Sequence, residues 1–323
     1  MTVSTEDQEL AVITGASTGI GAATARELAR RRFHVLAGVR RDRDADAIRG
    51  PGIEPLIIDI TNPDHIQALA TRVYGDPQGR ALRALVNNAG IGVNVPVEAF
   101  AIDKWRRLFE VNLFGHIAVT QALLPALIRS RGRVVNISSV GGKIAMATYG
   151  PYAGTKFALE AVSDALRREI APTGVQVVVV EPGAVSTEMP SRAIATASEL
   201  ASTMTSDQNR RYGALVQAIN AQTASHTTSC LPAEAAAKVI AKAVTARKPR
   251  TRYTVGRDAA LIPLVRILPD RTLDRILAAA LRPHFPTKSK VTTAGDRHDE
   301  TAVLAWRWTV VVRFRVTRWL VRG

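Results

Sequence analysis

Residues 10–29 read LAVITGASTGIGAATARELA, and this stretch decides the fold of the chain. An apolar run of strand length ends at Thr14, glycines follow at Gly15, Gly19 and Gly21, and a helical pattern continues from there. Glycines allow a tight turn and let the backbone approach a pyrophosphate, whose charge is favoured at a helix N-terminus. A glycine triplet alone is a weak signal, but here a strand precedes it and a helix follows it. The stretch therefore predicts a strand–turn–helix unit that binds a dinucleotide.

Apolar runs of strand length alternate with amphipathic stretches as far as residue 180. The strand-like runs are 10–14, 33–39, 54–59, 83–90, 132–138 and 175–183. Helical spacing is found over 22–32, 63–73, 103–130 and 152–171. This alternation is typical of βαβ units. It predicts an α/β fold with a doubly wound parallel sheet of the Rossmann type and helices on both faces.

The pattern changes after Pro182. Residues 186–230 are small, polar and mildly helical, without a strand signal, and we interpret them as a substrate lid segment because long connections of this kind often cover a site. A helix opened by Pro232 and a last strand at 252–256 are predicted to follow, whereas prolines 263 and 269 exclude one straight helix over 259–281. We assign residues 1–283 to a single nucleotide-binding domain.

Residues 284–323 form a basic tail rich in aromatic residues, in which 305–323 read AWRWTVVVRFRVTRWLVRG. Both a strand and a helix fit this pattern. A membrane-surface anchor, a contact with nucleic acid through Arg and Trp, and a poorly ordered tail are the alternatives. We expect no nucleic-acid partner, and peripheral membrane contact through the tail stays open.

Composition bounds the class of protein. The 323 residues are 46% hydrophobic, which is ordinary for a globular enzyme, and the formal net charge is +15. The single Cys230 cannot form an internal disulfide, and no spacing of Cys and His predicts a metal site. The polar, acidic start does not resemble a secretory signal, and we found no uncharged apolar window of about 18 residues. We therefore expect a cytoplasmic protein, with contact at a membrane surface as the alternative.

Residues 152–156 read YAGTK at the start of a predicted helix. Four positions are about one helical turn, so Tyr152 and Lys156 share a face. A phenol is a poor proton donor at neutral pH, but a neighbouring cation favours its ionised form. A helix-surface pair is the alternative. With Ser139 thirteen positions earlier, the pair predicts acid/base chemistry.

Several motifs in order make the chain resemble the short-chain dehydrogenase/reductase family. These are TGxxxGxG at 14–21, NNAG at 87–90, Asn112, Ser139, YxxxK at 152–156 and PG at 182–183. The resemblance implies that Asn112, Ser139, Tyr152 and Lys156 are catalytic. Ser139 would bind the substrate oxygen, Tyr152 would transfer the proton, Lys156 would lower the tyrosine pKa and hold the nicotinamide ribose, and Asn112 would hold a water.

The resemblance also implies a set of cofactor-binding residues. Asn88 would lie beside the adenosine half, Asp59 would contact the adenine and Thr187 the carboxamide, although Thr187 could instead be a helix cap. The second strand ends in Val39, Arg40 and Arg41, where an acidic residue would select NAD(H). Arginine can bind a 2′-phosphate, so we expect NADP(H) to be preferred, with Arg40 as the contact and NAD(H) as the alternative. The full expected set is Gly15, Ser17, Gly19, Ile20, Gly21, Arg40, Asp59, Asn88, Tyr152, Lys156 and Thr187.

The run from Lys156 to Thr187 resembles the steroid and retinol dehydrogenase branch of that family. This implies an oxidoreductase that interconverts a ketone and a secondary alcohol, or an aldehyde and an alcohol, of a hydrophobic substrate. The alternatives are a 3-oxoacyl thioester reductase and a non-catalytic NADP(H)-binding regulator that meets a membrane or a partner through its basic tail. The family resemblance also implies a homo-oligomer.

Overall fold

A computed structural model describes residues 8–226, 230–256, 259 and 262–286. By its internal packing the chain divides between Pro286 and Thr287, and the first unit holds all the described elements. The predicted tail therefore lies outside the described residues from residue 287 onward.

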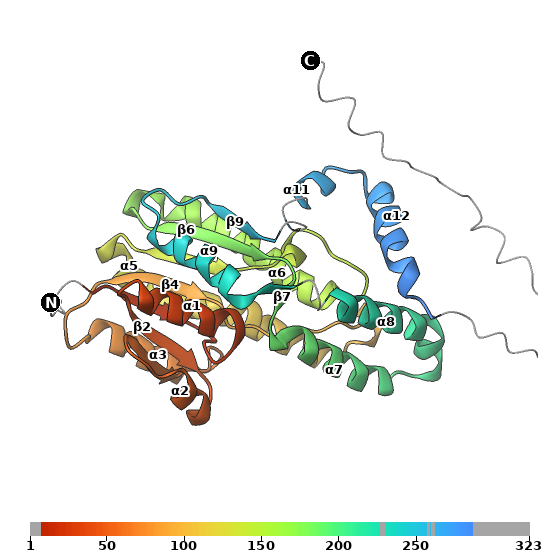
Figure 1. The fold of residues 1–323 in the computed structure, drawn as a ribbon, viewed down its shortest axis with the longest axis horizontal. Helices are drawn as coiled ribbons and strands as arrows, with labels where there is room; N and C mark the ends of the chain where they lie inside the picture. The colour runs from red at the N-terminus through yellow and green to blue at the C-terminus, as the bar shows by residue number, and fades with distance from the viewer. Residues whose placement is uncertain (1–7, 227–229, 257–258, 260–261, 287–323) are drawn as a thin grey trace, which may run out of the picture. The chain divides into compact units, whose positions relative to one another are not determined.

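A seven-stranded parallel sheet is the centre of the first unit (Figure 1). Its order is β3-β2-β1-β4-β5-β6-β9. The strands are β1 Leu10–Ile13, β2 His34–Val39, β3 Ile53–Ile57, β4 Leu82–Asn87, β5 Arg133–Ile137, β6 Gln176–Pro182 and β9 Arg252–Val255. The strand order reverses between β1 and β4, and ligands of such sheets bind at this switch point. The predicted doubly wound fold is confirmed.

Helices cover both faces of the sheet. They are α1 Gly19–Arg30, α2 Asp42–Ile48, α3 Pro63–Tyr74, α4 Ile102–Phe109, α5 Gly115–Ser130, α6 Gly150–Glu169, α7 Glu188–Ser202, α8 Ser206–His226, α9 Ala233–Thr245, α11 Ile262–Val265 and α12 Asp270–Leu281. Two-residue strands β7 Val185–Ser186 and β8 Leu231–Pro232 pair with each other. The last framework strand and the helix after Pro232 are where the sequence predicts them.

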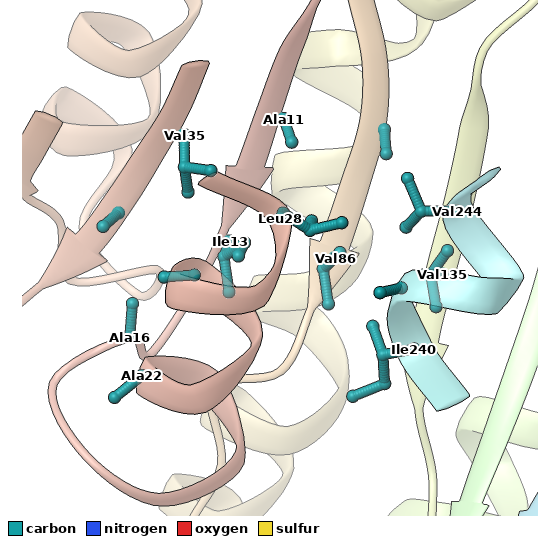
Figure 2. Packing of buried hydrophobic residues seen from close by; sticks show 14 of the residues in the cluster. Ala11, Ile13, Ala16, Ala22, Leu28, Val35, Val86, Val135, Ile240 and Val244 are labelled. Atoms are coloured by element: carbon teal, nitrogen blue, oxygen red, sulfur yellow. The ribbon is translucent and has the colours of Figure 1, made fainter. Parts of the chain in front are cut away.

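Alternate side chains of each central strand enter different cores. Ala11 and Ile13 of β1 pack with α1 and α9 on one face, as Figure 2 shows with Leu28 and Ile240. Leu10 and Val12 enter the other core with α3, α5 and the end of α6. Because successive side chains of a strand point to opposite faces, a strand buried on both sides must be apolar throughout. This explains the continuous apolar runs in the sequence.

The predicted helical stretch 103–130 is one continuous helix, Ile102–Ser130, but it contains a π-helical segment at Glu110–Phe114. Within the described residues this helix is long and apolar enough to cross a membrane, contrary to our reading of the sequence. More than half of the relevant window is buried in the fold, and a core helix meets the same criterion. Its length and composition alone therefore do not indicate a membrane span.

Most of the predicted lid segment is helical where it is described, as α7 and α8. Leu200 of α7 packs with Val93 and Val95 after β4. Leu215 and Ile219 of α8 pack with Tyr149 and with Leu281 of α12. Both helices thus contact the segments that lead to the predicted catalytic residues.

Candidate active site

The glycine-rich turn follows β1 and has room only for glycine at two positions. Gly15 has φ +67, and a β-carbon there would lie 2.7 Å from the Cα of Ala89. A β-carbon on Gly21 would lie 2.2 Å from the carbonyl oxygen of Gly15. Backbone atoms cannot move aside cheaply, so these contacts require glycine. They hold the turn and the start of α1 against the NNAG segment after β4.

Asn88 and Thr14 fasten this turn. The side-chain amide of Asn88 donates to the carbonyl oxygens of Thr14 and Gly15, at 3.0 and 2.9 Å. The buried hydroxyl of Thr14 accepts from the backbone N–H groups of Asn88 and Ala89, at 3.0 and 3.1 Å. Asn88 therefore acts on the shape of the turn. Thr14 was missed as a site residue, although it is the first letter of the TGxxxGxG motif.

The start of α1 fits the pyrophosphate of a dinucleotide. Thr18, the N-cap, is extended, and its side chain makes no capping hydrogen bond within the described part of the chain. The first N–H groups of a helix attract an anion, and here no cap competes for them. A cavity of about 820 Å³ borders the turn, with Ser17, Thr18, Gly19, Ser186 and Thr187 among its lining residues. Tyr152 and Ser139 do not line it, so it is not the place of the reacting atoms.

Thr187 lies next to the glycine turn. A β-carbon on Gly19 would come within 3.0 Å of the Thr187 methyl carbon. Its hydroxyl accepts from the N–H of Met189 at 3.3 Å, which makes it the N-cap of α7. The helix cap, which was the alternative role for Thr187, is thus present. A role toward the carboxamide stays a prediction.

Arg40 and Asp59 lie at the ends of neighbouring strands. Burial raises the pKa of Asp59, but bonds from Thr61 and the charges of Arg107 and Arg40 outweigh it, so the pKa is lowered. Thr61 donates to Asp59 Oδ1 through its N–H and its hydroxyl, at 2.9 and 2.7 Å. Asp59 is therefore an ionised hydrogen-bond acceptor whose Oδ1 already accepts two hydrogen bonds from Thr61.

The two arginines after β2 differ in their partners. Arg41 binds Asp44 at 2.8 Å, whereas Arg40 forms no ion pair with any described residue. Arg40 is exposed. Its guanidinium is the one of the two that remains available to an anion.

The predicted catalytic side chains come together at the start of α6. Tyr152 is in the first turn of α6, and Ser139 follows β5 and caps a short turn by accepting from Gly141 N–H at 3.0 Å. Lys156 is 4% exposed, and its Nζ lies 5.8 Å from the centre of the Tyr152 ring. The Lys156 ammonium donates to the carbonyl oxygen of Ile137 at 2.9 Å. Ser139 is partly exposed while Ser138 is buried, which favours Ser139 as the one that meets a substrate.

The pKa shifts differ from the expectation for Tyr152. Burial raises the pKa of Tyr152 to about 12, and its hydrogen bond with Ser139 offsets this only in part. Burial also lowers the pKa of Lys156 to about 8, against a favourable contribution from Glu160. The predicted lowering of the tyrosine pKa by Lys156 is therefore not found. The reason is that both groups are withdrawn from water, which disfavours their charged forms.

Asn112 lies in the π-helical segment and is fully buried. Its side chain accepts from the N–H of Ile91 at 2.9 Å and donates to the carbonyl of Ile91 at 2.9 Å and to Thr155 at 3.2 Å. Thr155 in turn donates to the carbonyl oxygen of Tyr152 at 2.7 Å. Asn112 thus connects the loop after β4 to the first turn of α6. Its side chain is engaged with protein groups, so a water held by Asn112 stays a prediction.

Sequence reasoning missed His116, which lies one turn after Asn112 and is buried. Burial and the charge of Lys156 lower the pKa of His116 to about 3, so the imidazole is neutral. Spacing from Asn112 was the only available signal, since a single histidine in an apolar helix has no motif around it.

A family model described as short chain dehydrogenase matches residues 9–198, which is more than half of the chain. The chain belongs to the short-chain dehydrogenases. The predicted family resemblance is confirmed, and the chain is an oxidoreductase of this family.

Individual short-chain dehydrogenases show how far the similarity extends. Retinol dehydrogenase 5 of Mus musculus is 38% identical over 289 residues, covering 82% of this chain and 86% of the relative. The NADPH-dependent 3-dehydrocapnine reductase of Ornithobacterium rhinotracheale is 32% identical over 281 residues, covering 84% and 97%. The crystal structure of a metagenomic short-chain oxidoreductase in complex with NADP is 26% identical, with a TM-score of 0.59 and coverage of 78% and 98%. These similarities confirm the retinol dehydrogenase-like branch and support a nicotinamide cofactor.

Proposed function

We propose that this short-chain dehydrogenase uses NADP(H) to interconvert a ketone and a secondary alcohol, or an aldehyde and an alcohol, of a hydrophobic substrate. The observation that carries the proposal is the meeting of Ser139, Tyr152 and Lys156 at the same edge of the sheet as a glycine turn that fits a pyrophosphate. When bound, the cofactor supplies or accepts a hydride.

The chain's own residues handle the oxygen and its proton. The Ser139 hydroxyl would donate to the substrate oxygen, and the Tyr152 phenol would give its proton to that oxygen during reduction. Lys156 would favour the phenolate that remains and would bind the nicotinamide ribose. Asn112, through Thr155, holds the backbone of Tyr152 in place.

Arg40 supports the choice of NADP(H). It directly follows β2, where the ribose of a dinucleotide is bound in such sheets, and Arg41 beside it is paired with Asp44. A free guanidinium binds a phosphate strongly and gains little from a ribose hydroxyl. The reductase from Ornithobacterium rhinotracheale, named as NADPH-dependent, supports the same choice.

The surroundings of Tyr152 support a hydrophobic substrate. Tyr149 packs with Leu215 and Ile219 of α8, and Val93 and Val95 pack with Leu200 of α7. A binding region lined by apolar side chains, with polar groups only at the reacting end, is typical of sites for lipophilic ligands. Steroids, retinoids and lipid ketones are the class we propose.

We also propose a homo-oligomer. Ile102 of α4, Phe114 in the π-helical segment and Phe157 of α6 are 64%, 51% and 37% exposed. Large exposed apolar side chains grouped on adjoining elements often mark an interface. Light scattering at micromolar concentration should give a multiple of 34.8 kDa. A monomer would contradict this part of the proposal.

The experiment is a substrate screen with purified protein. Oxidation of NADPH would be followed with steroid, retinoid and long-chain ketones and aldehydes, with 3-oxoacyl thioesters as the competing class and NADH in parallel. We expect turnover of at least one lipophilic carbonyl compound and a preference for NADPH. Cofactor binding without reduction of any of them, in either direction, would overturn the proposal and favour a non-catalytic NADP(H)-binding protein.

A further inference from the structure

A cluster of four charged side chains, Lys143, Glu160, Glu181 and Arg252, lies next to the segments that carry Ser139 and Tyr152. Glu160 Oε2 accepts from Lys143 Nζ at 2.7 Å and from Arg252 Nε at 3.1 Å. Glu181 Oε1 lies 3.4 Å from the same lysine nitrogen and 3.3 Å from the same arginine nitrogen. Both carboxylates are about 5% exposed. Two buried carboxylates and two partly exposed cations therefore lie close together, and pairs of this kind are screened less than pairs at the surface.

The cluster joins the four segments that carry the site. Lys143 ends the turn that Ser139 begins, Glu160 is on α6, Glu181 immediately precedes Pro182 at the end of β6, and Arg252 begins β9. The turn that contains Gly142 packs tightly on α6, since a β-carbon there would lie 3.2 Å from Glu160 Cγ and 3.2 Å from the Lys156 carbonyl oxygen. The bond between Lys143 and Glu160 thus fixes the loop of Ser139 against the helix of Tyr152 and Lys156.

Glu160 is placed one helical turn after Lys156, on the same face of α6. The Lys156 ammonium is deep in the fold and donates to the carbonyl oxygen of Ile137. A buried ammonium needs compensating negative charge nearby, and the Glu160 carboxylate stabilises its charged form.

We propose that Glu160, held by Lys143 and Arg252, is a positioning residue that keeps Lys156 protonated and in place for the reaction. The inference rests on the proposed function for the role of Lys156, but the charge relationship itself does not depend on any substrate. Lys143 and Glu160 carry opposite charges, so removing one or the other should shift the protonation of Lys156 in opposite directions.

Other titratable and charged groups surround Lys156 and Glu160. Around Lys156 these are Tyr152 on its own helix and His116 from α5, which is neutral. Around Glu160 they are Lys143, Asp164, Glu181 and Arg252. Burial and the charge of Glu160 raise the pKa of Glu181.

The test is a direct titration of Lys156 by NMR, with lysine labelled at its ε-carbon and the Lys156 resonance assigned by its loss in Lys156→Arg. It needs neither cofactor nor substrate. We expect Glu160→Gln to lower the titration midpoint by about half a pH unit or more, because a neighbouring negative charge is removed. We expect Lys143→Met to raise the midpoint, because Glu160 is then less neutralised while Arg252 still binds it.

Glu169→Gln is the matched control. It removes the same charge from the exposed far end of the same helix, and the midpoint should not change. If Glu160→Gln does not fold, the double variant Lys143→Met/Glu160→Gln, which leaves no unpaired lysine, is compared with Lys143→Met: a lower midpoint in the double variant supports the inference and an equal one overturns it.

Two further outcomes separate this inference from the proposed function. A midpoint that is equal in wild type and Glu160→Gln, or one that moves in the same direction in both variants, overturns the inference even if ketones are reduced. Midpoints that move in opposite directions support it even if no carbonyl compound is turned over, in which case only the proposed function fails.

Discussion

The side-chain amide nitrogen of Asn88 lies 2.5 Å from the point where a β-carbon on Gly21 would be. The same amide donates to the carbonyl oxygens of Thr14 and Gly15. The Asn88 side chain therefore holds the glycine turn and, with the carbonyl oxygen of Gly15, leaves room only for glycine at position 21.

Gly21→Ala should strongly destabilise the protein. The new methyl group meets both the Asn88 amide and, at 2.2 Å, the carbonyl oxygen of Gly15. Overpacking of this kind costs about 3 kcal/mol, which should lower the Tm by roughly 6–12 °C. Gly50→Ala is the control, because a β-carbon there has no atom within 4 Å. Equal melting temperatures in calorimetry for the two variants would contradict the structure of the turn.

Arg40→Ala should weaken NADPH binding about tenfold and leave NADH binding nearly unchanged, since a tenfold change corresponds to about 1.4 kcal/mol of lost phosphate contact. Arg41→Ala is the comparison, because its guanidinium already binds Asp44. Fluorescence titration of each variant with both cofactors measures the effect. A larger loss for Arg41→Ala would assign the phosphate contact to the other arginine.

Lys156 should make stability depend on pH. Its pKa is about 8 in the folded protein and 10.5 ordinarily, so between these values the unfolded chain binds a proton that the folded chain has released. The contribution of Lys156 to the free energy of unfolding therefore rises with pH between these two values. Urea unfolding at pH 7 and pH 10 should show wild type gaining roughly 2 kcal/mol relative to Lys156→Met. Parallel pH curves for the two proteins would be inconsistent with a buried ammonium.

Glu98 should tether the helix α8. Its carboxylate accepts from the Tyr212 hydroxyl at 2.8 Å and pairs with Arg211. Glu98→Ala should speed protease cleavage within α8 and raise KM a few-fold, roughly 2–5-fold, with little change in kcat, as expected when a lid loosens. Asp207→Ala is the control, because Asp207 pairs with Arg210 inside the same helix. Cleavage at the same rate in Glu98→Ala as in the control would show that the contact does not hold the lid.

Much of the framework could be predicted because it is encoded locally. Strands such as 175–183 are apolar throughout since they are buried on both faces, and the spacing of Tyr152 and Lys156 is set by the helical repeat. The order of motifs along the chain also placed Ser139 and Asn88 at strand ends, where a parallel sheet brings them together.

The rest depends on contacts between distant residues. Glu160 and Arg252 are 92 positions apart, and no local pattern marks them as partners. The π-helical segment that contains Asn112 looks like ordinary helix in the sequence. The direction of the Tyr152 pKa shift required knowledge of how deeply the site is buried, because burial and a neighbouring cation act in opposite senses.

The most direct test of the account compares Tyr152→Phe with wild type, using the best carbonyl substrate from the screen. Loss of the phenol should reduce kcat by at least about a thousandfold, because the proton donor is removed, while the Kd for NADPH and the Tm stay near their wild-type values. Turnover within about tenfold of wild type would contradict the central claim that Tyr152 is the acid of this site.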